Sequence, residues 1–70
     1  PKIERRLRQL AFVPLGRGQA LAVLVGEDGS VENRVVDLPP GMSAPALAEV
    51  GHYVSARLAG LTLAEAEGRL

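Results

Sequence analysis

Residues 20–25 (A-L-A-V-L-V) constrain this chain more than any other part of its sequence, because every one of them is apolar. Such a run is typical of a central strand that is covered on both faces of its sheet. Turn sequences flank the run, with Gly16-Arg17-Gly18 before it and Asp28-Gly29 after it. Glycine adopts positive φ at little cost, and Asp-Gly between apolar runs favours a hairpin. We therefore expect a neighbouring strand on each side of the run.

The strand expected before this run covers residues 6–13. Pro14 is expected to end that strand, because proline cannot donate a hydrogen bond to the ladder of a sheet. The strand expected after the run covers residues 31–38 and stops at a Pro-Pro-Gly sequence. Together these patterns predict a three-stranded antiparallel meander over residues 6–38.

Side chains in the third strand are expected to alternate between its two faces. Val31, Asn33 and Val35 share one face, and Glu32 and Arg34 share the other. Asn33 is therefore a polar residue between two valines. It is either buried, with hydrogen-bond partners in a neighbouring loop, or it lies at an edge and faces water. The sequence leaves both interpretations open.

Helical signals fill residues 43–70. Ser43 is suited to an N-cap, and Pro45 falls in the first helical turn, where its missing N–H costs little. Gly60 stands where a left-handed residue ends a helix, and the capping box Thr62-Leu63-Ala64-Glu65 then begins a second helix. Apolar residues of the first helix recur at spacings of three and four and predict one buried stripe: Leu47, Val50, Val54 and Leu58. The opposite side carries Glu49, His52, Ala56 and Ala59.

These elements predict an α+β fold, in which a three-stranded antiparallel β-meander is followed by one long helix and the start of a second. The chain begins at Pro1 rather than at methionine, and the second helix is expected to be still running at Leu70. We therefore expect residues 1–70 to form a single partial domain of a longer polypeptide.

No catalytic, cofactor-binding or metal-binding residue is assigned from the sequence. The chain has no cysteine and one histidine, His52. Glu49, His52 and Ser55 resemble a proton relay on paper, but such a string on an exposed helix face is usually a set of solvated polar residues. Gly16-Arg17-Gly18 lacks the third glycine and the helix of a dinucleotide fingerprint. Asp28, beside Glu27, lacks the alternating ligands of a calcium loop. We expect a protein that is not an enzyme and has no cofactor.

Charge in this sequence is balanced, with eight basic and eight acidic side chains. The exception is a basic N-terminus, where Lys2, Arg5, Arg6 and Arg8 face Glu4 alone. Such a run is more often a solvated strand edge or linker than a DNA contact, so we expect no specific DNA binding by this segment. No membrane span and no signal peptide are found in the sequence, which makes the cytoplasm the default location.

Two sequence motifs, together with the distance between them, resemble the sequences of a known family. They are Gly29-Ser30-Val31-Glu32-Asn33-Arg34-Val35, which follows Val23-Leu24-Val25, and Leu58-Ala59-Gly60-Leu61-Thr62-Leu63. The chain is similar, from Leu10 to Glu65, to the middle of the heat-inducible transcription repressor HrcA family. It departs from that family where a Leu-Asn pair is usual and Val54-Ser55 stand here.

The resemblance implies a repressor with an N-terminal winged helix that binds operator DNA, a GAF-like domain and an inserted dimerisation domain. It also implies control of chaperone operons and dependence on the GroE chaperonin. This chain would be part of the GAF-like region, and a non-catalytic regulatory or dimerisation segment. The alternative is a GAF-type sensor of a small ligand. We also predict a homo-oligomer, associated through the strands or through the apolar stripe of the long helix.

Overall fold

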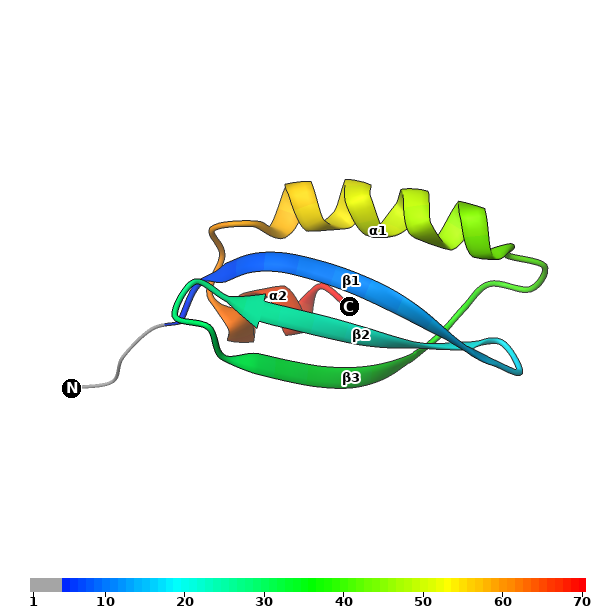
Figure 1. Ribbon diagram of the computed structural model, residues 1–70, viewed down its shortest axis with the longest axis horizontal. Coiled ribbons are helices and arrows are strands. Elements are labelled where there is room, and N and C mark those ends of the chain that lie inside the picture. Colours follow the sequence, from blue (N-terminus) through cyan, green and yellow to red (C-terminus); the bar gives the residue numbers. More distant parts are fainter. Residues whose placement is uncertain (1–4) are drawn as a thin grey trace.

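The computed structural model describes residues 5–70 and shows an α+β fold (Figure 1). Three antiparallel strands in the order β1-β2-β3 form the sheet, and two helices follow it in the chain. The strands are β1 (Leu7–Gly16), β2 (Gln19–Gly26) and β3 (Val31–Asp37), and the helices are α1 (Ala44–Leu58) and α2 (Leu63–Gly68). The predicted meander, with the apolar run as its central strand, is confirmed.

Both hairpin turns use positive φ, at their glycines as predicted and also at Arg17, for which the sequence does not predict it. Arg17 and Gly18, between β1 and β2, have φ of 55° and 74°, as a two-residue type I′ turn requires. Gly29, between β2 and β3, has φ of 87°, and its N–H donates to the carbonyl of Gly26 over 3.0 Å. Gly16-Arg17-Gly18 is therefore a turn.

Pro14 does not end the first strand, contrary to the prediction. It pairs with Ala20 of β2, and the strand continues to Gly16. The reason is the direction of the backbone. The N–H of Leu10, four residues earlier, points away from β2 and donates to Ser55. Because backbone direction repeats every second residue, the nitrogen of Pro14 also points away from β2, where no ladder hydrogen bond is lost.

Helix α1 begins and ends as predicted. The Oγ of Ser43 accepts a hydrogen bond from the N–H of Ala46 over 3.2 Å, and Gly60 has φ of 90° just beyond the C-cap. The apolar stripe is only partly buried. Leu47 and Leu58 are buried, but Val50 is 38% exposed, and Gly51 instead faces β1, in contact with Phe12.

Helix α2 carries the predicted capping box at its start. The Oγ1 of Thr62 accepts from the N–H of Glu65 over 3.1 Å, and the Oε1 of Glu65 accepts from the N–H of Thr62 over 2.9 Å. The helix ends at Gly68. The prediction that it is still running at Leu70 is therefore wrong for this structure. Within residues 5–70, neither helix has the length and apolar character needed to cross a membrane.

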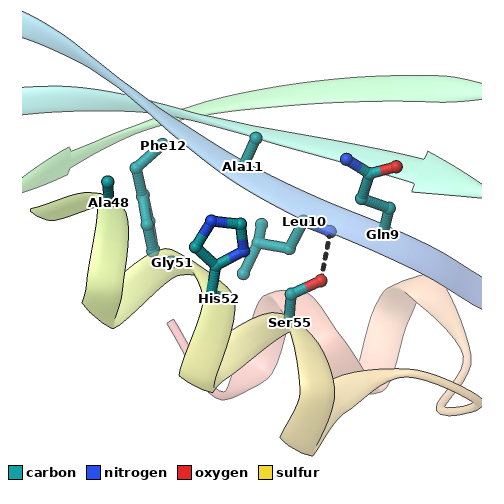
Figure 2. A pocket seen from close by; sticks show the side chains of 8 residues that line it. All are labelled: Gln9, Leu10, Ala11, Phe12, Ala48, Gly51, His52 and Ser55. Atoms are coloured by element: carbon teal, nitrogen blue, oxygen red, sulfur yellow. Dashed lines mark hydrogen bonds between the residues drawn. The ribbon is translucent and has the colours of Figure 1, made fainter.

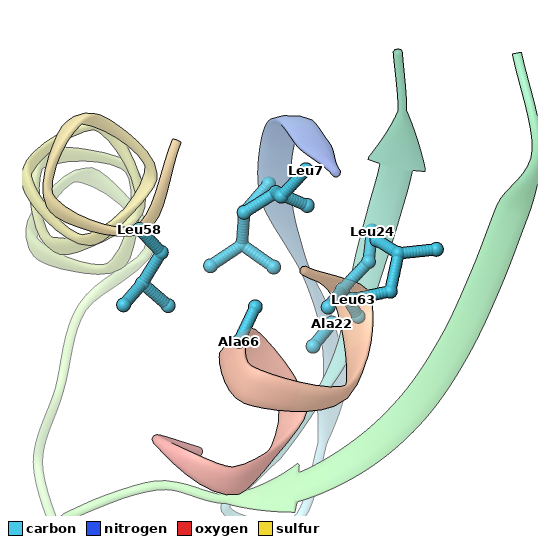
Figure 3. Close-up of a cluster of buried hydrophobic side chains, with 7 residues drawn as sticks. Leu7, Ala22, Leu24, Leu58, Leu63 and Ala66 are labelled. Atoms are coloured by element: carbon cyan, nitrogen blue, oxygen red, sulfur yellow. The ribbon is translucent and has the colours of Figure 1, made fainter. Parts of the chain in front are cut away.

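The core lies on one face of the sheet only. In Figure 3, α2 lies against this face and α1 lies beyond β1. The buried cluster draws on all of these elements except β3: Leu7, Leu10, Ala22, Leu24, Leu58, Leu63 and Ala66. On the other face of β2, Leu21, Val23 and Val25 are only half-buried. Strand β2 is central as predicted, and the described residues cover only one of its faces, because neither helix reaches the second face.

Residues 5–7 join the two ends of the described chain, and we refer to them as the N-terminal strap. The N–H of Leu7 donates to the carbonyl of Leu61, and the N–H of Leu63 donates to the carbonyl of Arg5, over 2.7 and 2.8 Å. On its other side the carbonyl of Arg6 accepts from the N–H of Glu27 over 2.8 Å. The strap thus connects the β2–β3 turn to the loop between the helices.

Candidate functional site

The structure separates the three residues that resemble a relay on α1. Glu49 and His52 are exposed, as expected for solvated polar residues. Ser55 instead turns toward the sheet, where its Oγ accepts a hydrogen bond from the N–H of Leu10 over 2.9 Å (Figure 2). Ser55 therefore satisfies a backbone donor at the edge of β1 and is not placed to exchange a proton with His52.

A groove runs between α1 and the outer edge of β1 (Figure 2). Its volume is about 310 Å³, at the lower end of the range for small-molecule sites. Small side chains on α1 leave room for it. At Gly51 the helix lies so close to β1 that an added Cβ would be 3.3 Å from Cδ2 of Phe12. The groove is lined by Gln9, Leu10, Ala11, Phe12, Ala48, Gly51, His52 and Ser55.

Asp28 is confirmed as a turn residue. Its Oδ1 accepts hydrogen bonds from the N–H and the Oγ of Ser30 over 3.0 and 2.6 Å. These bonds, with a smaller contribution from Arg5 at 3.9 Å, lower the pKa of the Asp28 carboxyl below its ordinary value. Among residues 5–70 the structure brings together no cluster of three residues that could hold a metal ion.

The basic N-terminal run is used largely within the domain itself. Lys2 and Glu4 lie outside the described residues. Arg6 donates through Nη1 to the carbonyl of Gly60 over 2.6 Å, and Arg5 approaches Asp28 of the β2–β3 turn. These contacts support the interpretation of the run as a solvated edge of the fold.

The sheet face opposite α2 is apolar and uncovered by any described element, and we name it the open face. Its residues come from all three strands: Val13, Leu21, Val23, Val25, Val31 and Val35. Val13, Val31 and Val35 are each about half exposed, at 45%, 58% and 53%. A contiguous apolar surface on a sheet typically marks an interaction site. The sequence contains a sign of this surface, because the alternation of side chains in β3 places Val31 and Val35 on the face away from the core.

Asn33 lies on the open face and is exposed, opposite Val23 of β2. Of the two interpretations left open by the sequence, the one in which it faces water is confirmed. Its position between two exposed valines makes it the polar centre of an apolar strand face.

The two outer edges of the sheet differ in their protection. The edge of β1 has irregular register at both ends and contains Pro14. It is also flanked by α1, whose Ser55 accepts the hydrogen bond from the outward N–H of Leu10. These are the devices that prevent another strand from pairing with an edge. Strand β3 has an unbroken register with β2, contains no proline, and has no strand on its outer side among the described residues.

Three charged residues meet where α2 approaches the inner face of β3. Arg34 donates through Nη1 to the backbone carbonyl of Glu67 over 2.8 Å. The carboxyl group of Glu67 lies beside that of Glu32, and hydrogen bonding with Glu32 raises the pKa of the Glu67 carboxyl above its ordinary value. Partial burial and the charge of Glu32 add to the rise, and Arg34 opposes it.

Comparison with known proteins shows the family. All of residues 1–70 match the family model described as "HrcA protein C terminal domain". The chain belongs to the HrcA family. The resemblance inferred from the two motifs is thereby confirmed, although the position of the segment in the middle of a parent chain stays a prediction.

Relatives within this family carry the name "Heat-inducible transcription repressor HrcA". One from Sphingopyxis alaskensis is 56% identical over all 70 residues, and one from Gluconobacter oxydans is 46% identical over the same length. A third, from Novosphingobium aromaticivorans, is 56% identical over 97% of the chain. The chain spans about a fifth of the length of each of these relatives (20%, 20% and 19%). No solved structure matches it.

Proposed function

We propose that this chain is a non-catalytic regulatory and dimerisation segment of a heat-inducible transcription repressor. The observation that carries the proposal is the match of every residue to the HrcA family model, at about half identity to proteins named as such repressors. The open face and the unprotected edge of β3 support the association part of the proposal, because both are surfaces that another protein surface would cover.

The DNA-binding activity of the repressor would lie outside this segment. Balanced charge and the use of Arg5 and Arg6 in contacts within the fold support this division. As the family resemblance implies, the parent protein would bind operator DNA before chaperone operons in the cytoplasm and depend on the GroE chaperonin. The described segment would then form part of a GAF-like domain that conveys regulation or holds two copies together.

The experiment is a repression assay with the full-length protein in bacterial cells, using a reporter behind its operator. Val35→Asp places a charge on the open face and is expected to relieve repression. Ala56→Asp, at an exposed position on the outer side of α1, is the matched control and is expected to repress normally. Circular dichroism of the purified variants distinguishes loss of association from unfolding. Full repression by a folded Val35→Asp variant would contradict the proposal.

The second candidate function is sensing of a small ligand, and the groove between α1 and β1 is the observation that favours it. The groove combines apolar walls with the polar side chains of Gln9, His52 and Ser55. A thermal-shift screen of the full-length protein against nucleotides tests this function. Stabilisation that is lost when Gly51→Val fills the groove would support a sensor, and no stabilisation by any nucleotide would count against it.

A further inference from the structure

The backbone of β3 presents a regular row of hydrogen-bonding groups on its outer side. Gly26 N–H donates to the carbonyl of Ser30, and Leu38 N–H donates to the carbonyl of Gly18, over 2.8 and 2.7 Å. Even-numbered residues of β3 therefore bond to β2, because backbone direction alternates along a strand. The N–H and C=O groups of Val31, Asn33 and Val35 consequently point outward, where no strand lies among the described residues.

The side chains along this edge form a pattern that is complementary to itself. The sequence from residue 31 to residue 35 is V-E-N-R-V, with Asn33 at its centre. Reading it backwards exchanges one valine for the other and exchanges Glu32 for Arg34. An antiparallel copy centred on Asn33 would therefore place valine opposite valine and glutamate opposite arginine.

We propose that β3 pairs antiparallel with β3 of a second copy of this chain, about a two-fold axis at Asn33. This proposal specifies the association part of the proposed function. The outward groups of Asn33 would bond to those of the same residue in the second copy, and those of Val31 to those of Val35. In every one of these pairs, both residues have N–H and C=O groups that point outward from β3. This register therefore provides hydrogen-bond partners for the outward groups of both strands.

Charge decides between a second copy and an unrelated strand. Charged side chains on an edge strand normally discourage pairing. Here the charges are of opposite sign and equally distant from Asn33, so the two-fold register places Glu32 opposite Arg34 of the second copy, twice in each dimer. Opposite charges directly across an antiparallel pair are favourable, and like charges are unfavourable. Pairing with an unrelated strand would not require opposite charges at equal distances from Asn33.

The same register extends the apolar surface and relieves a repulsion. Pairing brings Val31 beside Val35 of the second copy, so the two open faces become one continuous apolar face of a six-stranded sheet. On the inner face, Arg34 of the second copy approaches Glu32, whose carboxyl group lies beside that of Glu67 in the single chain. A positive charge at that place offsets the repulsion between these two side chains.

Disulfide cross-linking of the full-length protein tests the pairing directly. Asn33→Cys places two thiols across the axis, where Cα atoms of a hydrogen-bonded pair lie about 5.5 Å apart, within the range of a disulfide. Residues 1–70 contain no other cysteine. Under mild oxidation we expect a covalent dimer on a non-reducing gel. Ala56→Cys, which is exposed on α1, is the control and should cross-link far more slowly, and so should the unsubstituted protein. Equal rates for the two variants would overturn the proposal.

Charge reversal in the Asn33→Cys background identifies the partner strand. Glu32→Arg alone and Arg34→Glu alone each place like charges opposite each other, and each should slow cross-linking about tenfold. The variant with both substitutions again places opposite charges across the pair, but it does so only if the partner strand is β3 of a second copy. Recovery of the original rate therefore supports the proposal. A combined variant that remains slow would show that β3 pairs with another segment. This readout does not depend on repression, so it fails or succeeds separately from the reporter assay.

Discussion

Ser55→Ala is the most direct test of how α1 is attached to the sheet. The substitution removes the acceptor of the Leu10 N–H, which lies in a part-buried position. A net hydrogen bond of this kind contributes about 0.5–1.5 kcal/mol, and leaving the donor unsatisfied costs about 1–3 kcal/mol. The groove beside Ser55 admits water, which favours the lower values, and alanine is better than serine in a helix by about 0.5 kcal/mol.

The expected result is a loss of about 1 kcal/mol, which lowers the melting temperature of a domain of this size by about 4–8 °C. Thermal unfolding followed by circular dichroism measures the loss. Hydrogen exchange of the Leu10 amide measures its local cause, since that amide should exchange faster in the variant. Ser55→Asn keeps a side-chain acceptor at this position, so it should preserve the protection.

His52→Ala is the matched control, because His52 lines the same groove but makes no hydrogen bond to the described residues. It should change stability by less than about 0.5 kcal/mol. A Ser55→Ala variant that melts within a degree of the original protein, with unchanged exchange at Leu10, would refute the role assigned to this bond.

Three further predictions follow from the turns, the charges and the sequence. Gly29→Val should destabilise the hairpin by about 1–2 kcal/mol more than Ser30→Val, because Gly29 has φ of 87°; thermal melts of the two variants measure the difference. Glu67→Gln should raise the melting temperature at pH 7 and lose that gain near pH 4. The raised pKa of Glu67 means that its contribution to stability is present below its ordinary value of 4.5 and is lost as the pH rises through the raised pKa. The isolated segment should show no preference for an inverted-repeat operator over random duplex in a mobility-shift assay at physiological salt, since it has no net charge and no helix suited to a groove.

Local features of this fold could be predicted from the sequence because neighbouring residues determine them. The N-cap at Ser43, the capping box at Thr62 and the positive φ of Gly29 each depend on a few adjacent residues, and each is confirmed. The two motifs from which the family could be recognised are also local. One forms the β2–β3 turn and strand β3, and the other forms the loop between the helices.

Features that depend on distant elements were beyond sequence reasoning. Pro14 is tolerated because the strand lies at an edge and its nitrogen faces away from β2, which depends on strand order. Gly51 is buried in place of Val50 because the helix approaches Phe12 closely. Ser55 belongs to the sheet side of the helix for the same reason. Each of these outcomes is set by where α1 lies against β1, and the periodicity of α1 alone does not define that.

The N-terminal strap determines when this domain can finish folding during its synthesis. Arg6 contacts Gly60 across 54 residues of chain, and the strap obtains its remaining partners only when residue 63 has been made. At about 5–20 residues per second, the ribosome needs about 1–5 s to proceed from the end of β3 to that point. Residue 63 leaves the ribosome later than β3 by the same interval, and until then no α2 covers the inner face of the sheet. A chaperone that binds exposed apolar surface therefore has its best access to this segment before the second helix emerges.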